Sequence, residues 1–591
     1  MGSRHVRAAW LGALYLVLSV FFCSPLFAQP NGLGGNDWDQ HLFYYGAVLK
    51  DVVEYGQAPF WNPWYCGGNV LWQNPQVALL SPVYPLTAVM SLQLAMKVNI
   101  VLHYWIGFVG MHLLLTRAIG LGFLPLVIYL ATLATAAGAP AIHLAVGHSV
   151  FLPGFYLPLQ MLLLFRACRT GAVKDVLLAG AILALMVFNG GVHILPMVFA
   201  AIGTFAVFAA VLARQWRPVA VAALFVIAGL AFSAPKLLPV SMFVTGDRFW
   251  DTRNPTDHPD RMTLELLQHT YLDPQQGLRS QFDHQRHGWH EYGNYVGPFS
   301  ALVLVVSWAW VILRRGRLAH RSLGEGGGLS LALTTLVLFA LSLGEFGSLA
   351  PASIATHLPL FSSFRIPSRY TIPFLLFAVM TTGWALASTV PAALLTRRSV
   401  RWTVAVVCIL ASVHLMSVNR RLFTNVFTQE AFDTSFHWMS GPRAIATDFE
   451  SSAYRPGAPM LRALSEDRAF FFCYESLQLV RTASTNDGRP VIAADDKSQI
   501  VSTAFTPNRI EFKVLGGAEP SRIFLNQNYS PGWTSTAGPV LEPGAAMGSV
   551  MLAPGQTGTF AFEFFPQGLV AGSVIFAFAL AASAVFWRRQ L

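Results

Sequence analysis

The sequence predicts a polytopic α-helical membrane protein of about 12 spans that also carries an outward β-sandwich-like domain near its C-terminus. Of its 591 residues, 54% are hydrophobic and only 12% are charged, and many apolar runs reach the length of a membrane span. The basic residues lie in short loops between these runs, so the formal net charge of +10 serves to orient the spans. We therefore expect contact with membrane lipids and no nucleic-acid partner. After residue 419 the composition changes to short alternating segments, which indicate the β-rich domain.

The apolar runs place the spans along the chain. At roughly 20 residues each, they lie near residues 8–28, 94–116, 119–139, 151–166, 175–190, 194–213, 219–243, 294–313, 328–345, 369–391, 402–418 and 568–587. The first run is either a signal peptide or a retained span, and its poor cleavage pattern favours the span. Arg117, Arg214 and Arg397 follow alternate spans and fall on the same side as Arg4 and Arg7. The positive-inside rule then predicts that both termini are cytoplasmic.

This topology divides the chain into three parts. We expect a membrane domain over residues 1–418 with outward loops at 30–85, 244–293 and 346–368, a β-rich domain over 419–567, and a C-terminal membrane helix over 568–591. Four segments of the β-rich domain are typical of strands, namely IEFKV (510–514), RIFLNQNY (522–529), GSVML (548–552) and GTFAFEFF (558–565). Because no catalytic constellation is evident among them, we expect this β-sandwich to position substrate or to bind a partner.

The first outward loop carries two carboxylates, Asp37 and Asp39, just beyond the first span. Carboxylates at this depth can act as a base, or hold a metal, where a lipid-linked substrate presents its polar head. From Gln40 to Tyr55 the apolar positions recur at helical spacing, which predicts an amphipathic helix lying along the membrane surface. Asp37 precedes Gln40 by three residues, a capping-box pattern, so Asp37 either caps this helix or joins the chemistry. Asp39 is the preferred base, and a divalent cation (Mg²⁺ or Mn²⁺) on the two aspartates is left open.

Further polar residues fall in predicted outward turns. His193 belongs to NGGVH (189–193), where the Asn-Gly-Gly sequence is turn chemistry. His143 and His148 lie in another turn and lack a fixed ligand spacing, so we expect polar groups beside a cavity, within reach of substrate, more than metal ligands.

Charged residues near two later spans complete the candidate site. Glu291 immediately precedes YGNYVGP, at the same expected depth as Asp39, and either caps a helix or positions an acceptor hydroxyl. Arg365 and Arg369 lie in FRIPSRY at the outward start of the tenth span. Arginines beside a helix start can bind a phosphate through forked hydrogen bonds, so we expect them to contact a phosphate group.

Two of the five cysteines, Cys66 and Cys473, lie outside the predicted spans on the outward side. They are the only pair that this topology allows to form a disulfide in an oxidising compartment. Spacing alone cannot establish connectivity, and two unpaired thiols are the favoured expectation.

Several motifs together resemble a known family. They are the outward Asp39, Gln40 and His41 after the first span, GQAPFWNPWYCGGN, SPVYP, GHSVFLPGFYLPL, EYGNYVG, FRIPSRY and the C-terminal NYSPGW. In this order they resemble the YfhO-like bacterial membrane proteins, which are similar to the GT-C superfamily of glycosyltransferases.

The resemblance implies an inverting glycosyltransferase in the bacterial cytoplasmic (inner) membrane. It would move a sugar from a polyprenyl-phosphate-linked donor to a cell-envelope glycan, lipid or protein acceptor at the outer face. The base role falls on Asp39, with Asp37 second, and the carrier phosphate would meet Arg365 and Arg369. The substrate would also contact Glu291, His41, His148 and His193.

The alternative is a transporter or flippase of lipid-linked saccharides. Such a protein would need polar residues inside the membrane along the transport path. Lys97, His103 and Lys236 are the main candidates, whereas the charged clusters gather on one face. This distribution favours chemistry at the membrane surface.

Overall fold

Each predicted span corresponds to a helix in the computed structural model, which describes residues 2–245, 249–251, 261–274, 287–314, 327–358, 361, 364, 366–389, 397–432, 446–450, 457–470, 477–479, 491–541 and 547–590. Within these residues nine segments are long and apolar enough to cross a membrane, namely Ala8–Phe27, Leu92–Ile119, Leu124–Ala145, Ser149–Thr170, Gly191–Ala213, Arg217–Val244, Pro367–Thr389, Arg398–Phe423 and Leu569–Trp587. The other three predicted spans are helices of 16 residues each. The predicted class, a polytopic helical membrane protein, is confirmed.

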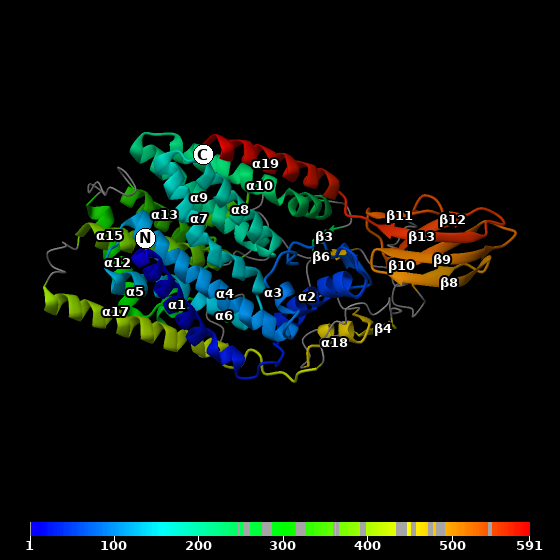
Figure 1. The fold of residues 1–591 in the computed structure, drawn as a ribbon, viewed down its shortest axis with the longest axis horizontal. Coiled ribbons are helices and arrows are strands. Elements are labelled where there is room, and N and C mark those ends of the chain that lie inside the picture. The colour runs from blue at the N-terminus through cyan, green and yellow to red at the C-terminus, as the bar shows by residue number, and fades with distance from the viewer. Residues whose placement is uncertain are drawn as a thin grey trace.

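The helices of the bundle are α1 (Gly2–Cys23), α4 (Leu92–Leu113), α5 (Leu124–Thr135), α6 (Gly138–Ala145), α7 (Leu157–Thr170), α8 (Val173–Phe188), α9 (Leu195–Ala213), α10 (Arg217–Val244), α12 (Pro298–Leu313), α13 (Gly327–Ser342), α15 (Thr371–Thr389), α17 (Arg398–Asn419) and α19 (Leu569–Gln590). Shorter helices are α2 (Asp37–Val53), α3 (Val83–Leu86), α11 (Leu264–Leu272), α14 (Pro351–Ala355) and α18 (Pro459–Ser465). The turns η3 (Ser149–Tyr156), η4 (Gly191–Ile194), η5 (Trp289–Glu291) and η6 (Pro367–Tyr370) lead into or join bundle helices. In Figure 1 the bundle forms one body with a β-rich body at one end.

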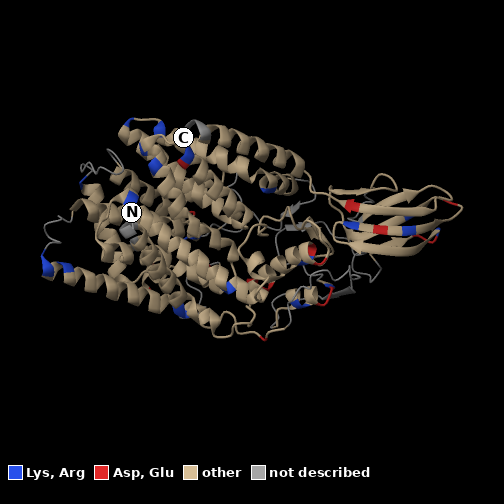
Figure 2. Cartoon of the chain, in the orientation of Figure 1, with Lys and Arg blue, Asp and Glu red and all other residues tan. Residues whose placement is uncertain are grey.

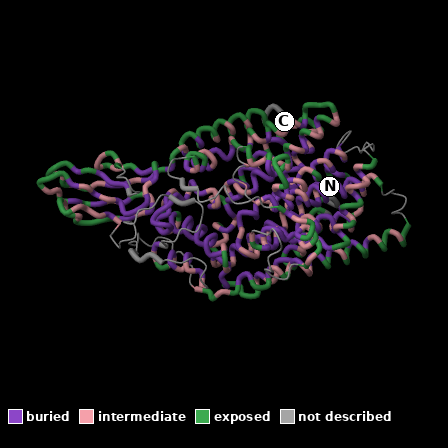
Figure 3. The backbone as a smooth tube through the Cα atoms, turned by 180° about the vertical axis from the view of Figure 1, so that it is seen from behind, coloured by how far each residue is buried: buried purple, intermediate pink, exposed green. Residues whose placement is uncertain are grey.

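The C-terminal helix α19 packs along α10 in the bundle (Figure 1). A side chain at Gly572 would place its Cβ 2.4 Å from the carbonyl oxygen of Ala234, so glycine permits this close helix contact. The apolar outer face of α19 is exposed, as the green tube near the C-terminus in Figure 3 shows. An exposed apolar helix face is expected where the solvent is lipid.

Lysine and arginine are unevenly distributed over the bundle. Figure 2 shows many of them at the end that carries both termini and lies away from the β-sheets. This distribution is consistent with the positive-inside rule used to assign the topology.

The C-terminal β-rich region is a two-layer sandwich. One sheet has the strand order β12 (Met547–Leu552), β10 (Ser521–Asn528), β7 (Ile492–Ala494), and the other has the order β11 (Trp533–Ser535), β13 (Gly558–Phe564), β9 (Arg509–Gly516), β8 (Ser498–Thr506). Alternate residues such as Ile510, Phe512 and Val514 point inward and pack against Ile523 and Val550 of the other sheet. The four strands expected from the sequence are all present, so the β-sandwich prediction is confirmed.

The first long loop, which follows α1, packs on this sandwich. It forms a short hairpin of β1 (Trp61–Asn62) and β2 (Asn69–Val70). Trp61 packs edge-to-face against Trp533, with ring centroids 5.2 Å apart, and donates its indole N–H to Gln527. Asn528 donates to the carbonyls of Cys66 (2.6 Å) and Gly68 (2.9 Å).

Two further pairs of short strands lie outside this loop. They are β3 (Phe249–Asp251) with β6 (Leu477–Leu479) and β4 (Ala446–Glu450) with β5 (Arg468–Phe470).

Helix α2 confirms the expected helix in this loop but not its surface position. Every residue from Trp38 to Asp51 is buried. Lys50, expected to face solvent, instead pairs with Glu54 at 2.8 Å and with Asp467 from the segment after α18. The prediction of a helix lying on the membrane surface is wrong because α18 and its flanking segment cover the polar side of α2.

Two buried lysines of the bundle fasten the ends of the first loop. Lys97 donates to the carbonyls of Gln29 (2.6 Å), Pro30 (2.9 Å) and Gly32 (3.2 Å). Burying a charge is costly unless it is hydrogen-bonded, and these carbonyls supply the bonds. The lysine therefore fixes the start of the loop to α4.

Lys236 makes the matching contact at the far part of the loop, donating to the carbonyls of Trp72 and Asn74 at 2.7 Å each. Nearby, Pro239 has no N–H, so the carbonyl of Pro235 lacks its usual helical donor. The indole N–H of Trp72 supplies one at 2.8 Å. The loop thus also satisfies a backbone group that α10 itself leaves open.

The cysteine prediction needs correction. Cys66 is disulfide-bonded, whereas Cys23, Cys168 and Cys408 are free. The expectation of an unpaired thiol at Cys66 is therefore wrong, and Cys473 lies outside the described residues.

Replacing Lys97 or Lys236 by Met keeps an unbranched side chain but removes the donors to buried loop carbonyls. We expect each variant to lower the free energy of unfolding by about 3 kcal/mol, the scale of leaving buried acceptors unpaired. Chemical unfolding in mixed micelles measures this. Lys513→Met on β9, where the side chain is exposed, is the control and should change stability by less than about 0.5 kcal/mol. Equal stability of all three variants would contradict the anchoring role.

Candidate functional site

The start of α2 is fixed against the turn that follows α6. The backbone N–H of Asp37 donates to Val146 at 3.1 Å, and the indole N–H of Trp38 donates to the carbonyl of Leu144 at 2.8 Å. Gly147 has φ +104° in this turn, and a Cβ there would lie 2.3 Å from the backbone nitrogen of Trp38. Only glycine fits this approach, which brings the first turn of α2 beside His148.

Asp37, His148 and His143 form a connected chain. The carboxylate Oδ2 of Asp37 lies 3.1 Å from Nε2 of His148, and Nδ1 of His148 lies 3.0 Å from Nδ1 of His143. His143 is buried, and the side chain of His148 is only 13% exposed. The two histidines, which the sequence placed in one outward turn, thus link the loop carboxylate to the interior.

A second charged pair lies next to this chain. Arg369 at the end of η6 donates from Nε to one oxygen of Glu291 (2.7 Å) and from Nη2 to the other (2.5 Å). Burial raises the pKa of the Glu291 carboxyl, but the guanidinium and its hydrogen bonds outweigh burial and hold that pKa well below its usual range. Glu291 is therefore ionised, and Arg369 neutralises it.

Aromatic contacts join the two groups. The ring of His143 stacks on Phe151 with centroids 4.2 Å apart, and the guanidinium carbon of Arg369 lies 5.3 Å from the centroid of the same phenyl ring.

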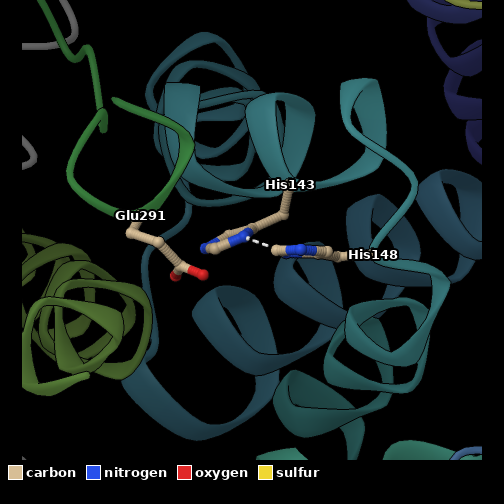
Figure 4. Close-up of side chains that lie close together, drawn as sticks. All are labelled: His143, His148 and Glu291. Atoms are coloured by element: carbon tan, nitrogen blue, oxygen red, sulfur yellow. Dashed lines mark hydrogen bonds between the residues drawn. The ribbon is translucent and has the colours of Figure 1, made fainter. Parts of the chain in front are cut away.

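One potential ligand atom from each of His143, His148 and Glu291 lies within 4.8 Å of the others. Figure 4 shows these three side chains pointing toward one another from different segments.

Two more predicted residues lie near this cluster. His41, one turn along α2, is buried, which lowers its pKa to about 4 although Asp37 opposes the shift. His193 of η4 lies close enough to Arg369 and His148 for their charges to act on its imidazole. Gly190 before it has φ +80°, in agreement with the turn expected from NGGVH. The cluster therefore unites Asp37, His41, His148, His193, Glu291 and Arg369; Arg365 lies outside the described residues.

Asp39 belongs to a different environment. Its two carboxylate oxygens accept the backbone N–H groups of Met460 and Leu461, at 3.0 Å each, at the start of α18. Burial raises the pKa of Asp39 to about 6, and the two N–H donors offset part of that rise. The N-cap of α2 is Asn36, which makes no side-chain cap bond, while Asp37 contacts His148. The aspartates thus have the opposite surroundings from those expected: Asp39 fastens a distant helix, and Asp37 faces the histidines.

The structure also bears on the expected alternative in which Asp37 and Asp39 together hold a metal ion. Because their carboxylates bind different partners, they do not form a pair of ligands aimed at one point. Sequence reasoning placed His143 with His148 beside a cavity but did not connect it to Glu291, and it did not single out Phe151 or His290, the residue before Glu291. The segment HLAVGHSVF already places His143, His148 and Phe151 around one turn.

An apolar cavity lies beside the cluster, within the bundle. Its empty space, including its open mouth, is about 670 Å³. The cavity is lined by Gly107, Ala134, Thr135, Pro140, Phe151, Gly154, Phe155, Leu157, Pro158, Ile194, Met197, Ile372, Pro373 and Leu376. Phe151 belongs to both the cavity wall and the polar cluster, and Ile194 adjoins His193. A ligand with a polar head and an apolar tail could therefore contact both regions.

Comparison with known proteins gives distant structural likenesses. No protein-family model and no curated protein matches the sequence. Among solved structures, the mycobacterial arabinofuranosyltransferase AftD is similar to this chain with a TM-score of 0.41 at 15% identity, over 70% of this chain and 27% of that one. Two classes of a point mutant of AftD give TM-scores of 0.46 and 0.44 at 16% and 15% identity, over 94% and 95% of this chain. The chain spans 41% of the length of those two structures.

The Arg369–Glu291 pair gives a stability test. Arg369→Met leaves the Glu291 carboxylate buried without its partner, so we expect a loss of about 3–5 kcal/mol in the free energy of unfolding. Adding Glu291→Gln should recover part of this loss because the buried charge is gone. Arg509→Met is the matched control, since this exposed arginine also pairs with carboxylates, and it should cost less than about 1 kcal/mol. A loss no larger than the control's, measured in mixed micelles, would contradict the pairing.

The pKa of Asp39 gives a pH test. A carboxyl whose pKa is raised to about 6 on folding keeps a proton that the unfolded chain loses near pH 4. The stability contributed by this carboxyl is therefore present below pH 4 and is lost as the pH rises to about 6, by about 3 kcal/mol in all. Asp39→Asn has no such proton. Unfolding measured from pH 4 to 7 should show the wild type losing stability relative to the variant, and parallel curves would refute the shift.

Proposed function

We propose that this protein is a GT-C-type glycosyltransferase that uses Asp37 to activate an acceptor hydroxyl at the outer face of the bacterial cytoplasmic membrane. The observation that carries the proposal is the 3.1 Å contact of the Asp37 carboxylate with His148, in a polar cluster that shares Phe151 with an apolar cavity. The motif resemblance supports the same reaction class. The base is reassigned from Asp39 because two backbone N–H groups already hold that carboxylate.

Asp37 would act as the general base. The acceptor hydroxyl gives its proton to the carboxylate while its oxygen forms a bond to the anomeric carbon of the donor sugar. The bond from that carbon to the lipid phosphate breaks, and the phosphate leaves with the electron pair, which inverts the anomeric centre. Base assistance of this kind is typically worth about 10²–10⁴ in rate. His148 would orient the carboxylate from its other side.

The donor would be a sugar linked to a polyprenyl phosphate. The apolar cavity suits an isoprenoid tail, whereas its neighbours Arg369 and the histidines suit a phosphate and sugar head. Arg369 already engages Glu291 with two N–H groups, but guanidinium has five, so donors remain for a phosphate. Glu291, His41 and His193 would then contact the sugar or the acceptor; Arg365 is a further proposed phosphate contact.

The acceptor would be a glycan, lipid or protein of the cell envelope, presented on the same side. This orientation puts both termini in the cytoplasm and the β-sandwich outside. We propose residues 1–418 as the membrane domain, 419–567 as the outward β-rich domain and 568–591 as a final membrane anchor. The sandwich supports the first loop through Trp61 and Asn528 and would position substrate or a partner there.

The transporter alternative is less well supported. Lys97 and Lys236, its main intramembrane candidates, bind loop carbonyls. His103 contacts the carbonyl of Asn99 and the side chain of Asn189. These contacts give all three residues a structural role, which leaves the polar cluster at the loop as the basis for chemistry.

Asp37→Asn preserves size and removes the proton acceptor, so we expect sugar transfer to fall by at least about 100-fold with normal membrane insertion. Asp39→Asn should retain activity within a few-fold. Each variant is introduced into a deletion strain, and lipid-linked sugars and envelope glycans are quantified by mass spectrometry. Glu511→Gln on β9, whose side chain is 43% exposed and lies outside the cluster, is the control. If Asp37→Asn restores the wild-type profile, the assignment of the base fails; if the deletion itself changes no glycan or lipid-linked sugar, the transferase proposal fails.

A further inference from the structure

We propose that His143, His148 and Glu291 form a binding site for one divalent transition-metal ion, with Zn²⁺ as the best match. Two imidazoles and one carboxylate form a set found in zinc sites that keep an open fourth position. The site is distinct from the aspartate pair expected from the sequence. Metal binding requires no substrate, so this inference stands independently of the proposed transferase function.

The arrangement of the ligand atoms supports the site. At a metal–nitrogen distance of about 2.1 Å, two nitrogens 3.0 Å apart subtend about 90° at the metal, and tetrahedral geometry needs only about 0.4 Å more separation. A carboxylate oxygen of Glu291 and one ring nitrogen of each histidine lie within 4.8 Å of one another, so Glu291 would approach by roughly 1–1.5 Å to complete the set. Figure 4 shows the three groups converging from η5, α6 and the turn after α6.

Asp37 fixes the tautomer that a metal ligand needs. With Nε2 of His148 donating to the Asp37 carboxylate 3.1 Å away, the ring takes the tautomer that carries its proton on Nε2. Its Nδ1 then directs a lone pair at Nδ1 of His143, 3.0 Å away. Two ring nitrogens at this distance require either a shared proton or a cation between them. A carboxylate behind a ligating histidine is the usual outer-shell partner in metal sites.

Glu291 keeps capacity for a metal although it binds Arg369. Each of its oxygens accepts one N–H from the guanidinium, and Nε2 of His290 lies 3.6 Å from Oε1, so the second lone pair of Oε2 is directed at neither. Ligating carboxylates are commonly held by such hydrogen bonds. The two carboxylates of Asp37 and Glu291 also offset the charge of Arg369 and half of the charge of a divalent ion. His143 is held by stacking on Phe151, so the site is built from groups with fixed orientations.

The full chain, purified in detergent and stripped of metal with a chelator, is titrated with Zn²⁺ alone and analysed by calorimetry and elemental analysis. We expect one high-affinity ion per chain and zinc X-ray absorption with two imidazole ligands. His148→Gln or His143→Gln should weaken binding by more than about 100-fold, because loss of an outer-shell partner alone costs about 10- to 100-fold. Asp37→Asn, which removes only that partner's charge, should give the smaller loss.

His357→Ala, two residues after the end of α14, is the control, since this histidine is exposed and lies outside the cluster. Thermal melting of each variant without metal confirms folding, and a variant that fails to fold is replaced by Glu291→Gln. Stoichiometric binding that both cluster variants reduce supports the site. If the wild type takes up no stoichiometric zinc, or if the cluster variants bind as the control does, the two histidines only share a proton and the proposal is overturned.

Discussion

A loop buried between membrane helices and a β-sandwich must satisfy its backbone polar groups without bulk water, and this constraint organises the structure. The buried ammonium groups of Lys97 and Lys236 each donate hydrogen bonds to loop carbonyls. The side-chain amide of Asn528 on β10 donates to two further loop carbonyls from the sandwich. Unpaired groups at these places would cost several kcal/mol each in an apolar setting. The loop is therefore held at both ends by the bundle and at its hairpin by the sandwich, which gives α2 one position. The candidate site depends on that position because Asp37 begins α2.

Helix geometry then separates the two aspartates. Successive residues of an α-helix are about 100° apart, so Asp37 and Asp39 point roughly 200° apart around α2. One side of the helix faces the turn after α6, and the other faces α18. Asp37 consequently meets His148, while Asp39 meets the N–H groups of Met460 and Leu461. Their order along the chain contains no information about which side is which, since α18 follows more than 400 residues later.

Local patterns predicted the parts whose causes are local. Apolar runs located the helices of the twelve predicted spans, and alternation located β9, β10, β12 and β13, because bilayer thickness and sheet pairing impose those periods on each segment. The surface position of α2 was wrong for the opposite reason. Lys50 and Glu54 look like a solvated face in sequence, but Asp467 and the segment around α18 cover them. His143 was underestimated similarly: its partners Glu291 and Arg369 come from distant segments.

The buried charges of the cluster are balanced in pairs, and this balance bears on any reaction there. Arg369 neutralises Glu291, whereas the Asp37 carboxylate contacts the imidazole of His148. In the two proposals above, Asp37 is both the base and the carboxylate behind a ligating histidine, whereas the sequence favoured Asp39 as the base and left Asp37 between helix capping and chemistry. The apolar cavity beyond Phe151 adds the low dielectric in which such charge differences have their largest effect.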